Sequence, residues 1–138
     1  MTEDHIERGR AHILQDRDIP DGVVVFRIDG PFMFGATDRL RDVVGDPGRL
    51  PPMVILRLRH MTAMDATGLQ AIEDLADRCR ETGRTLILCG AQEQPARLMR
   101  QAEFERHVGA EQICSSVEDA LARARQLLEP AQRLESAS

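Results

Sequence analysis

The stretch Met64-Asp65-Ala66-Thr67-Gly68-Leu69 decides how the middle of this chain folds. It follows the apolar run Met53-Val54-Ile55-Leu56, which has the length and composition of a buried strand. Beyond it, apolar residues recur at helical spacings of three and four: Leu69, Ile72, Leu75, Ala76 and Cys79. The pattern predicts a strand, a short polar turn and an amphipathic helix. Such a junction gathers backbone N–H groups, a carboxylate and a hydroxyl at a helix N-terminus, where anions and partner proteins are bound.

The composition indicates one globular domain with an aliphatic core. The chain has 138 residues, of which 42% are hydrophobic and 30% are charged, with four Phe, no Tyr and no Trp. The net charge is -5 and the pI is about 5.4. This balance argues against nucleic acid as a partner, because there is no basic excess to neutralise phosphates.

Cysteine usage and hydropathy exclude several further classes. Cys79, Cys89 and Cys114 are odd in number and widely spaced, which fits neither a disulfide framework nor a zinc site. No apolar run approaches the roughly 20 residues of a membrane helix, and the acidic N-terminus is not that of a signal peptide. We therefore expect the chain as given to be soluble, without a metal or a cofactor.

Short apolar runs alternate with helical patterns along the chain. We predict strands at residues 23–28, 54–58, 85–89 and 112–114, and an extended segment at 32–34. Helices are expected between them, so the order predicts an α/β fold with a mostly parallel, mixed sheet of about five strands and four to five helices. Ligands meet such sheets at the carboxyl ends of the strands, where the 65–68 turn is expected.

Two boundaries divide the chain into three segments in this prediction. Residues 1–20 are polar and are expected to form a linker, with a short helix or an edge strand near 11–14. Residues 21–129 form the domain, and residues 130–138 form a disordered tail. Two capping-box patterns, Thr67-x-x-Gln70 and Ser115-x-x-Glu118, are expected to start the second and the last helix, although Asp65 alone is also a good helix cap.

The 65–68 turn after the central strand resembles that of the STAS domain (sulfate transporter and anti-sigma factor antagonist), over roughly residues 21–128. In stand-alone antagonists of this family, a kinase phosphorylates the serine directly after the aspartate. The corresponding residue here is Ala66, which has no oxygen to phosphorylate. A second run, Val23-Val24-Val25-Phe26-Arg27-Ile28-Asp29-Gly30-Pro31-Phe32-Met33-Phe34-Gly35-Ala36, resembles the C-terminal STAS domains of bacterial SulP-type sulfate and anion permeases.

The SulP resemblance implies a non-catalytic regulatory domain on the cytoplasmic side of the bacterial inner membrane, with residues 1–20 leading from the membrane region. Its implied partners are the transporter membrane domain in the same full-length chain, a cytosolic protein such as acyl carrier protein, and a second copy in a homodimer. The alternative is a stand-alone anti-sigma factor antagonist or stress-signalling protein. A nucleotide-binding sensor ranks lower, because the chain has no G-x-G-x-x-G or P-loop pattern. No catalytic set emerges, so we predict that the chain is not an enzyme.

The candidate site residues follow from these two motifs. Asp65, Ala66, Thr67 and Gly68 are expected to form a partner or anion contact loop, in which Thr67 is a candidate phosphoacceptor because Ala66 occupies the usual serine position. A possible interface comprises Phe32, Phe34 and His60, with core packing as the default for both Phe residues and solvent exposure as the default for His60. Another candidate set for binding an anion is Arg57, Arg59 and Arg84, against the default that they pair with the chain's carboxylates.

Overall fold

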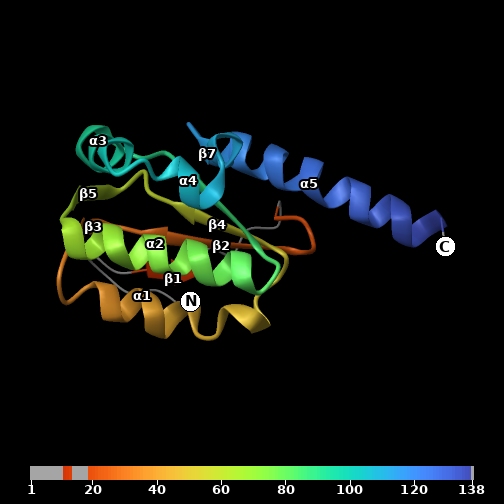
Figure 1. Cartoon of the computed structure of the whole chain (residues 1–138), viewed down its shortest axis with the longest axis horizontal. Helices are drawn as coiled ribbons and strands as arrows, with labels where there is room; N and C mark the ends of the chain where they lie inside the picture. Colours follow the sequence, from red (N-terminus) through yellow and green to blue (C-terminus); the bar gives the residue numbers. More distant parts are fainter. Residues whose placement is uncertain (1–10, 14–18, 138) are drawn as a thin grey trace.

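The main sheet is mixed and lies at the centre of the molecule (Figure 1). The computed structural model describes residues 11–13 and 19–137. The strand order is β1-β2-β4-β6-β7, and β1 alone runs antiparallel to its neighbour. The strands span β1 (Ala11–Ile13), β2 (Val23–Ile28), β4 (Met53–Arg57), β6 (Thr85–Cys89) and β7 (Ile113–Cys114). The predicted α/β fold is therefore confirmed, with β1 as the edge strand expected near residues 11–14.

Two further strands form a small parallel sheet beside the main one. They are β3 (Gly30–Phe32) and β5 (Met61–Met64), which pair from Gly30 opposite Met61 to Phe32 opposite Met64. The sequence did not predict β5, and the extended segment expected at 32–34 ends at Phe32 instead. This small sheet carries the chain out of the main sheet and into the 65–68 turn.

The described residues also form five α-helices and two short 3-10 turns. The helices are α1 (Thr37–Val44), α2 (Ala66–Glu81), α3 (Glu93–Gln101), α4 (Glu105–Val108) and α5 (Val117–Ala137). The 3-10 turns are η1 (Pro47–Arg49) and η2 (Ala110–Gln112). Helix α5 continues to Ala137, so the tail expected from residue 130 onward is helical up to that residue.

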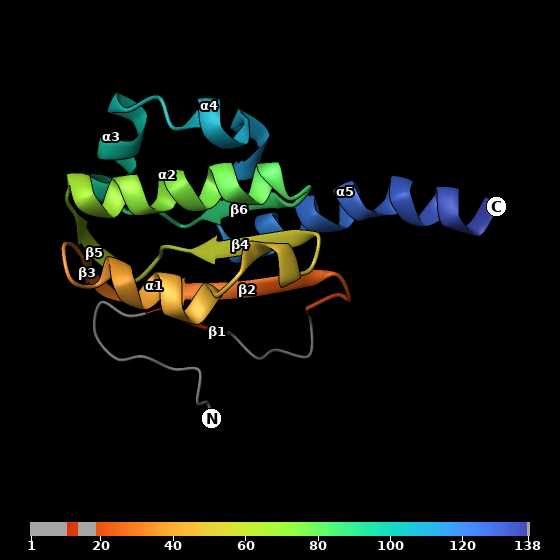
Figure 2. The same ribbon diagram turned by 60° about the horizontal axis from the view of Figure 1, so that its bottom comes forward.

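Helices cover both faces of the sheet, which explains why its strands are apolar throughout (Figure 2). Side chains of α1, α2, α3 and the residues before α4 pack on one face, against Phe26, Leu56 and Leu88. Helix α5 packs on the other face, where Ala120 and Ala124 contact a second cluster of strand residues. No helix in the described part of the chain is both long and apolar enough to cross a membrane.

Candidate functional site

Asp65 organises the predicted turn by using both oxygens of its carboxylate. Its backbone is extended (φ −106°, ψ −177°), and Oδ1 accepts a hydrogen bond from the Gly68 N–H at 2.8 Å. This is the geometry of a helix N-cap. The second oxygen, Oδ2, accepts from the Phe34 N–H at 3.4 Å. Asp65 therefore caps α2 and also ties the loop between β3 and α1 to the start of that helix.

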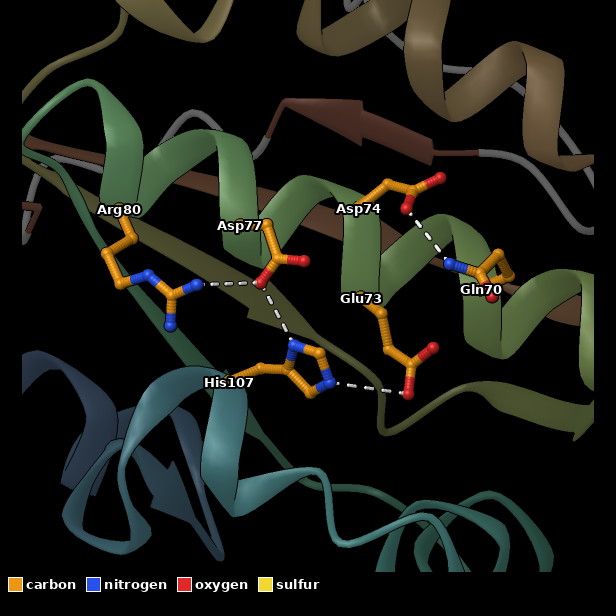
Figure 3. A network of polar contacts seen from close by, with 6 residues as sticks. All are labelled: Gln70, Glu73, Asp74, Asp77, Arg80 and His107. Atoms are coloured by element: carbon orange, nitrogen blue, oxygen red, sulfur yellow. Dashed lines mark hydrogen bonds and ion pairs between the residues drawn. The ribbon is translucent and has the colours of Figure 1, made fainter.

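The predicted capping box between Thr67 and Gln70 is wrong. Asp65 occupies the N-cap position, and Gln70 instead donates from Nε2 to Asp74 Oδ1 at 3.0 Å, one turn further along α2 (Figure 3). Asp65 satisfies the cap, and the Thr67 side chain is exposed to solvent. The second predicted box is displaced by one residue, since Ser116 Oγ accepts from the Asp119 N–H at 3.1 Å.

Gly68 is required where α2 begins, because the end of β3 approaches it closely. A Cβ atom at this position would lie 2.3 Å from the Phe32 carbonyl oxygen and 3.0 Å from the Phe32 ring. The distance to the carbonyl oxygen is too short for any side chain, and the distance to the ring is tight, so only glycine admits the Phe32 backbone at this point. The close approach fixes the loop after β3 against the helix.

The two Phe residues proposed as an interface have opposite environments. Phe32 is 1% exposed and lies in the core, which agrees with the default of core packing and leaves it out of the candidate interface. Phe34 is 85% exposed and follows the end of β3, so core packing does not apply to it. Met33 is also partly exposed, as are Ala66 and Thr67 on the adjoining turn. We call Met33, Phe34, Ala66 and Thr67 the Phe34 surface.

A side-chain amide from α3 supports the same corner from the other side. Gln94 Oε1 accepts from the Met64 N–H at 2.9 Å, and Gln94 Nε2 donates to the Met64 carbonyl at 3.0 Å. The amide thereby replaces a neighbouring strand at the last residue of β5. No local sequence pattern indicates this contact, because its partners lie thirty residues apart.

His60 does not belong to the Phe34 surface. Its side chain is exposed, and its carbonyl accepts from the Gly30 N–H at 2.7 Å. Gly30 is the first residue of β3, whereas Phe34 follows the last one. The small sheet therefore separates His60 from the 65–68 turn.

The three candidate anion-binding arginines have different roles. The guanidinium of Arg84 donates to the backbone carbonyls of Gly48 (2.7 Å), Leu50 (3.0 Å) and Thr82. It therefore fastens η1 to the start of β6 and is not available to an anion. Arg57 and Arg59 instead line a hollow of about 260 Å³ at the carboxyl edge of the sheet, together with Ser115, Ser116 and Glu118.

The cysteines are buried or half-buried thiols without a described metal partner. Burial raises the pKa of Cys79 to about 11 and that of Cys89 to about 12. Burial also raises the pKa of Cys114, which is the register neighbour of Cys89 on β7. Within residues 11–13 and 19–137, no cluster of His, Cys, Asp and Glu suited to a metal ion is present. These thiols stay protonated at neutral pH and serve as packing groups.

Two features of α2 lie away from the turn. A groove of about 530 Å³ runs between α1 and α2, with Leu40 and Leu75 among its lining residues and Arg41, Asp77 and Arg78 among its charged ones. On another side of α2, His107 from α4 lies between Glu73 and Asp77 (Figure 3). The sequence indicated neither feature, because both depend on contacts between distant segments.

The fold and this corner together define an α/β domain in which the capped start of α2 binds the backbone of an exposed aromatic residue, Phe34. The family model for the STAS domain matches residues 15–120. The chain belongs to the STAS domain family.

Solved structures of transporter domains are similar to this chain. A sulfate transporter family protein from Wolinella succinogenes is 33% identical, with a TM-score of 0.73 over 80% of this chain and 91% of that chain. The SulP transporter STAS domain from Vibrio cholerae is 28% identical, with a TM-score of 0.70 over 80% and 87% of the two chains. The predicted resemblance to SulP transporter STAS domains is confirmed.

The antagonist branch of the family shares the fold. An anti-sigma factor antagonist from Mycobacterium paratuberculosis is 19% identical, with a TM-score of 0.61 over 83% of this chain and 94% of that chain. At this identity the similarity concerns the fold alone. No curated protein sequence matches the chain.

Proposed function

We propose that this chain is the regulatory STAS domain of a SulP-family inorganic anion transporter. It acts on the cytoplasmic side of the bacterial inner membrane, through contacts with the transporter membrane domain or with cytosolic proteins and without chemistry of its own. One observation carries this proposal: Phe34 is 85% exposed and its backbone is held by Asp65. The similarity to the Wolinella and Vibrio structures supports the assignment to a transporter.

An exposed aromatic side chain on a fixed loop is typical of an interface anchor. Aromatic residues are enriched among those that dominate binding energy, and burying one side chain of this size removes about 150–250 Å² from water. The Phe34 loop is held by the Asp65 carboxylate and by the close packing of Gly68 on Phe32. Little ordering entropy is therefore lost when a partner covers it.

Transport by the full-length protein in proteoliposomes tests this role. Phe34→Ser removes the aromatic ring without disturbing the core, and we expect the rate of anion uptake or its regulation to change severalfold. Glu81→Ser is the matched control, because Glu81 is exposed at the opposite end of α2. Equal uptake by wild type and both variants, with equal amounts of folded protein, would contradict the proposal.

A stand-alone anti-sigma factor antagonist is the second candidate function, because the antagonist from Mycobacterium paratuberculosis shares the fold of this chain. Ala66 is exposed at the first position of α2, so a serine there would be accessible to a kinase. We expect no phosphorylation of the wild-type chain by a cognate anti-sigma kinase, and phosphorylation of Ala66→Ser serves as the positive control. Robust phosphorylation of the wild type, including at Thr67, would favour the antagonist role.

Other partners are secondary to this proposal. An acidic protein such as acyl carrier protein requires a local basic surface, for which Arg57 and Arg59 at the carboxyl-edge hollow are the candidates. Loss of binding in Arg57→Ala would support such a partner. Light scattering tests whether the full-length transporter forms a homodimer. Calorimetry with ATP or GTP tests whether the domain binds a nucleotide.

A further inference from the structure

We propose that His107 is a proton-dependent latch that fastens helix α4 to helix α2. Its ring lies between two carboxylates of α2, with Nδ1 2.9 Å from Asp77 Oδ1 and Nε2 3.6 Å from Glu73 Oε2 (Figure 3). The centroid of the His107 ring also lies 5.5 Å from the centroid of the Phe104 ring, and Phe104 is fully buried. The contact is thus built from both ring nitrogens, on a fixed apolar support.

The chemistry of imidazole makes this contact sensitive to protonation. An imidazolium ring carries an N–H on each nitrogen, so it can donate to Asp77 from Nδ1 while Nε2 forms an ion pair with Glu73. A neutral ring carries one N–H, so its other nitrogen turns a lone pair toward a carboxylate oxygen. Histidine is the side chain that ordinarily changes charge between pH 5 and 8. Loss of the proton therefore replaces one of the two attractions with a repulsion.

The remaining charges near His107 leave the two carboxylates dominant. From α2, Arg80 binds Asp77 Oδ1 at 3.3 Å and so shares this oxygen with the ring. On the segment of His107 itself, Arg106 pairs with Glu103 at 3.3 Å. The other titratable groups on the elements packed against α4 are Glu105 on α4 itself, the exposed Glu111 on η2, and the buried thiols Cys79 on α2 and Cys89 on β6. Helix α2 also carries Asp74, Arg78 and Glu81, which line the groove toward α1.

The segment from α3 to α4 has a second attachment that does not titrate. At its start, the uncharged amide of Gln94 binds the Met64 backbone at 2.9 and 3.0 Å. At its end, the His107 contact depends on one proton. Deprotonation therefore loosens α4 while α3 stays in place. The latch is independent of the transporter role proposed above.

Amide hydrogen exchange of the whole chain between pH 5.5 and 8.5 tests the latch, with protection factors corrected for intrinsic rates. The amides of Arg106, His107 and Gly109, which are bonded within the α4 turn, should lose protection by about fivefold as pH rises. The Met64 amide, held by Gln94, should not change. An NMR titration of the His107 ring should coincide with the loss.

Matched variants complete the test. His107→Gln keeps a polar side chain without a titrating proton, and its α4 protection should be independent of pH. His60→Gln alters an exposed histidine elsewhere and should retain the wild-type profile. If His107→Gln does not fold, Glu73→Gln should reduce the pH effect. A wild-type pH profile in the folded His107→Gln or Glu73→Gln variant would overturn the proposal. So would a parallel loss of protection at the Met64 amide in the wild type.

Discussion

At the residue scale, Asp65 joins local and tertiary structure through one carboxylate. Oδ1 satisfies the Gly68 N–H in α2, and Oδ2 satisfies the Phe34 N–H in a loop thirty-one residues earlier. A helix cap alone needs only one of these bonds. The second bond gives Asp65 a role in presenting Phe34, beyond its role in starting the helix.

Substitution of Asp65 should separate these two bonds. Asp65→Ala removes both, and we expect a loss of about 1–2 kcal/mol in the free energy of unfolding. Asp65→Asn keeps an oxygen acceptor for the Gly68 N–H, so its loss should be smaller. Urea unfolding followed by far-UV circular dichroism measures both, since the chain has no Trp or Tyr. Wild-type stability in Asp65→Ala would show that the bonds contribute nothing.

The buried thiols predict an unusually simple alkaline transition. The chain has no Tyr and its eighteen Lys-plus-Arg positions are all Arg, so cysteines are the side chains that titrate between pH 9 and 11. Burial raises the pKa of Cys79 to about 11 and of Cys89 to about 12 in the folded protein, above the ordinary value of 9.0. Stability is therefore fully present below pH 9 and is lost as the unfolded thiols ionise at higher pH.

The expected slope above pH 9 is about 1.4 kcal/mol per pH unit for each buried thiol. Urea unfolding at half-unit intervals from pH 8 to 11 measures it. Cys89→Ala should reduce this slope by the contribution of one thiol. It should also lower the free energy of unfolding modestly at pH 8. A slope unaffected by this substitution would show that Cys89 already ionises in the folded state.

At the element scale, the small sheet depends on a side chain that completes it. The β5 strand is short, and Gln94 from α3 binds both backbone groups of its last residue, Met64. Gln94→Leu should leave these two groups without protein partners and cost about 1–3 kcal/mol. Gln101→Leu, at the exposed end of the same helix, is the control and should stay within about 0.5 kcal/mol. Equal stability of the two variants would contradict this role.

The sequence predicted the elements whose own residues determine them. The apolar runs of β2, β4 and β6 and the helical spacing of α2 were sufficient, because both periods are local. The β5 strand escaped prediction, since Met-Thr-Ala-Met is short and gains its strand conformation by pairing with β3. Three further contacts were not predicted, because each joins segments about thirty residues apart. They are the bond between Asp65 and Phe34, the Gln94 contact and the His107 contacts.

The same reasoning explains why core packing was expected for both Phe32 and Phe34 but holds for Phe32 alone. The extended segment expected at 32–34 would place both side chains on one strand face, but β3 ends at Phe32 and the chain turns at Met33. The turn sends Phe32 into the core and Phe34 into solvent. Sequence spacing predicts a shared face only while the strand continues.

At the scale of the whole molecule, the Phe34 surface and the outer part of α5 lie at opposite ends. The loop after β3 and the start of α2 lie at one end of the domain, whereas α5 extends beyond the opposite end of the sheet (Figures 1 and 2). The Phe34 surface can therefore be covered by a partner while both faces of the sheet stay packed by helices. This arrangement fits a module that binds without rearranging its core.

Photo-crosslinking from position 34 tests the central claim most directly. A photoreactive phenylalanine analogue replaces Phe34 in the full-length protein in native membranes, and the control places it at Glu81, at the far end of α2. Mass spectrometry then identifies the linked peptides. Our account predicts links from position 34 to the transporter membrane domain or a cytosolic partner, and few from position 81. Equal, unspecific labelling from both positions would contradict it.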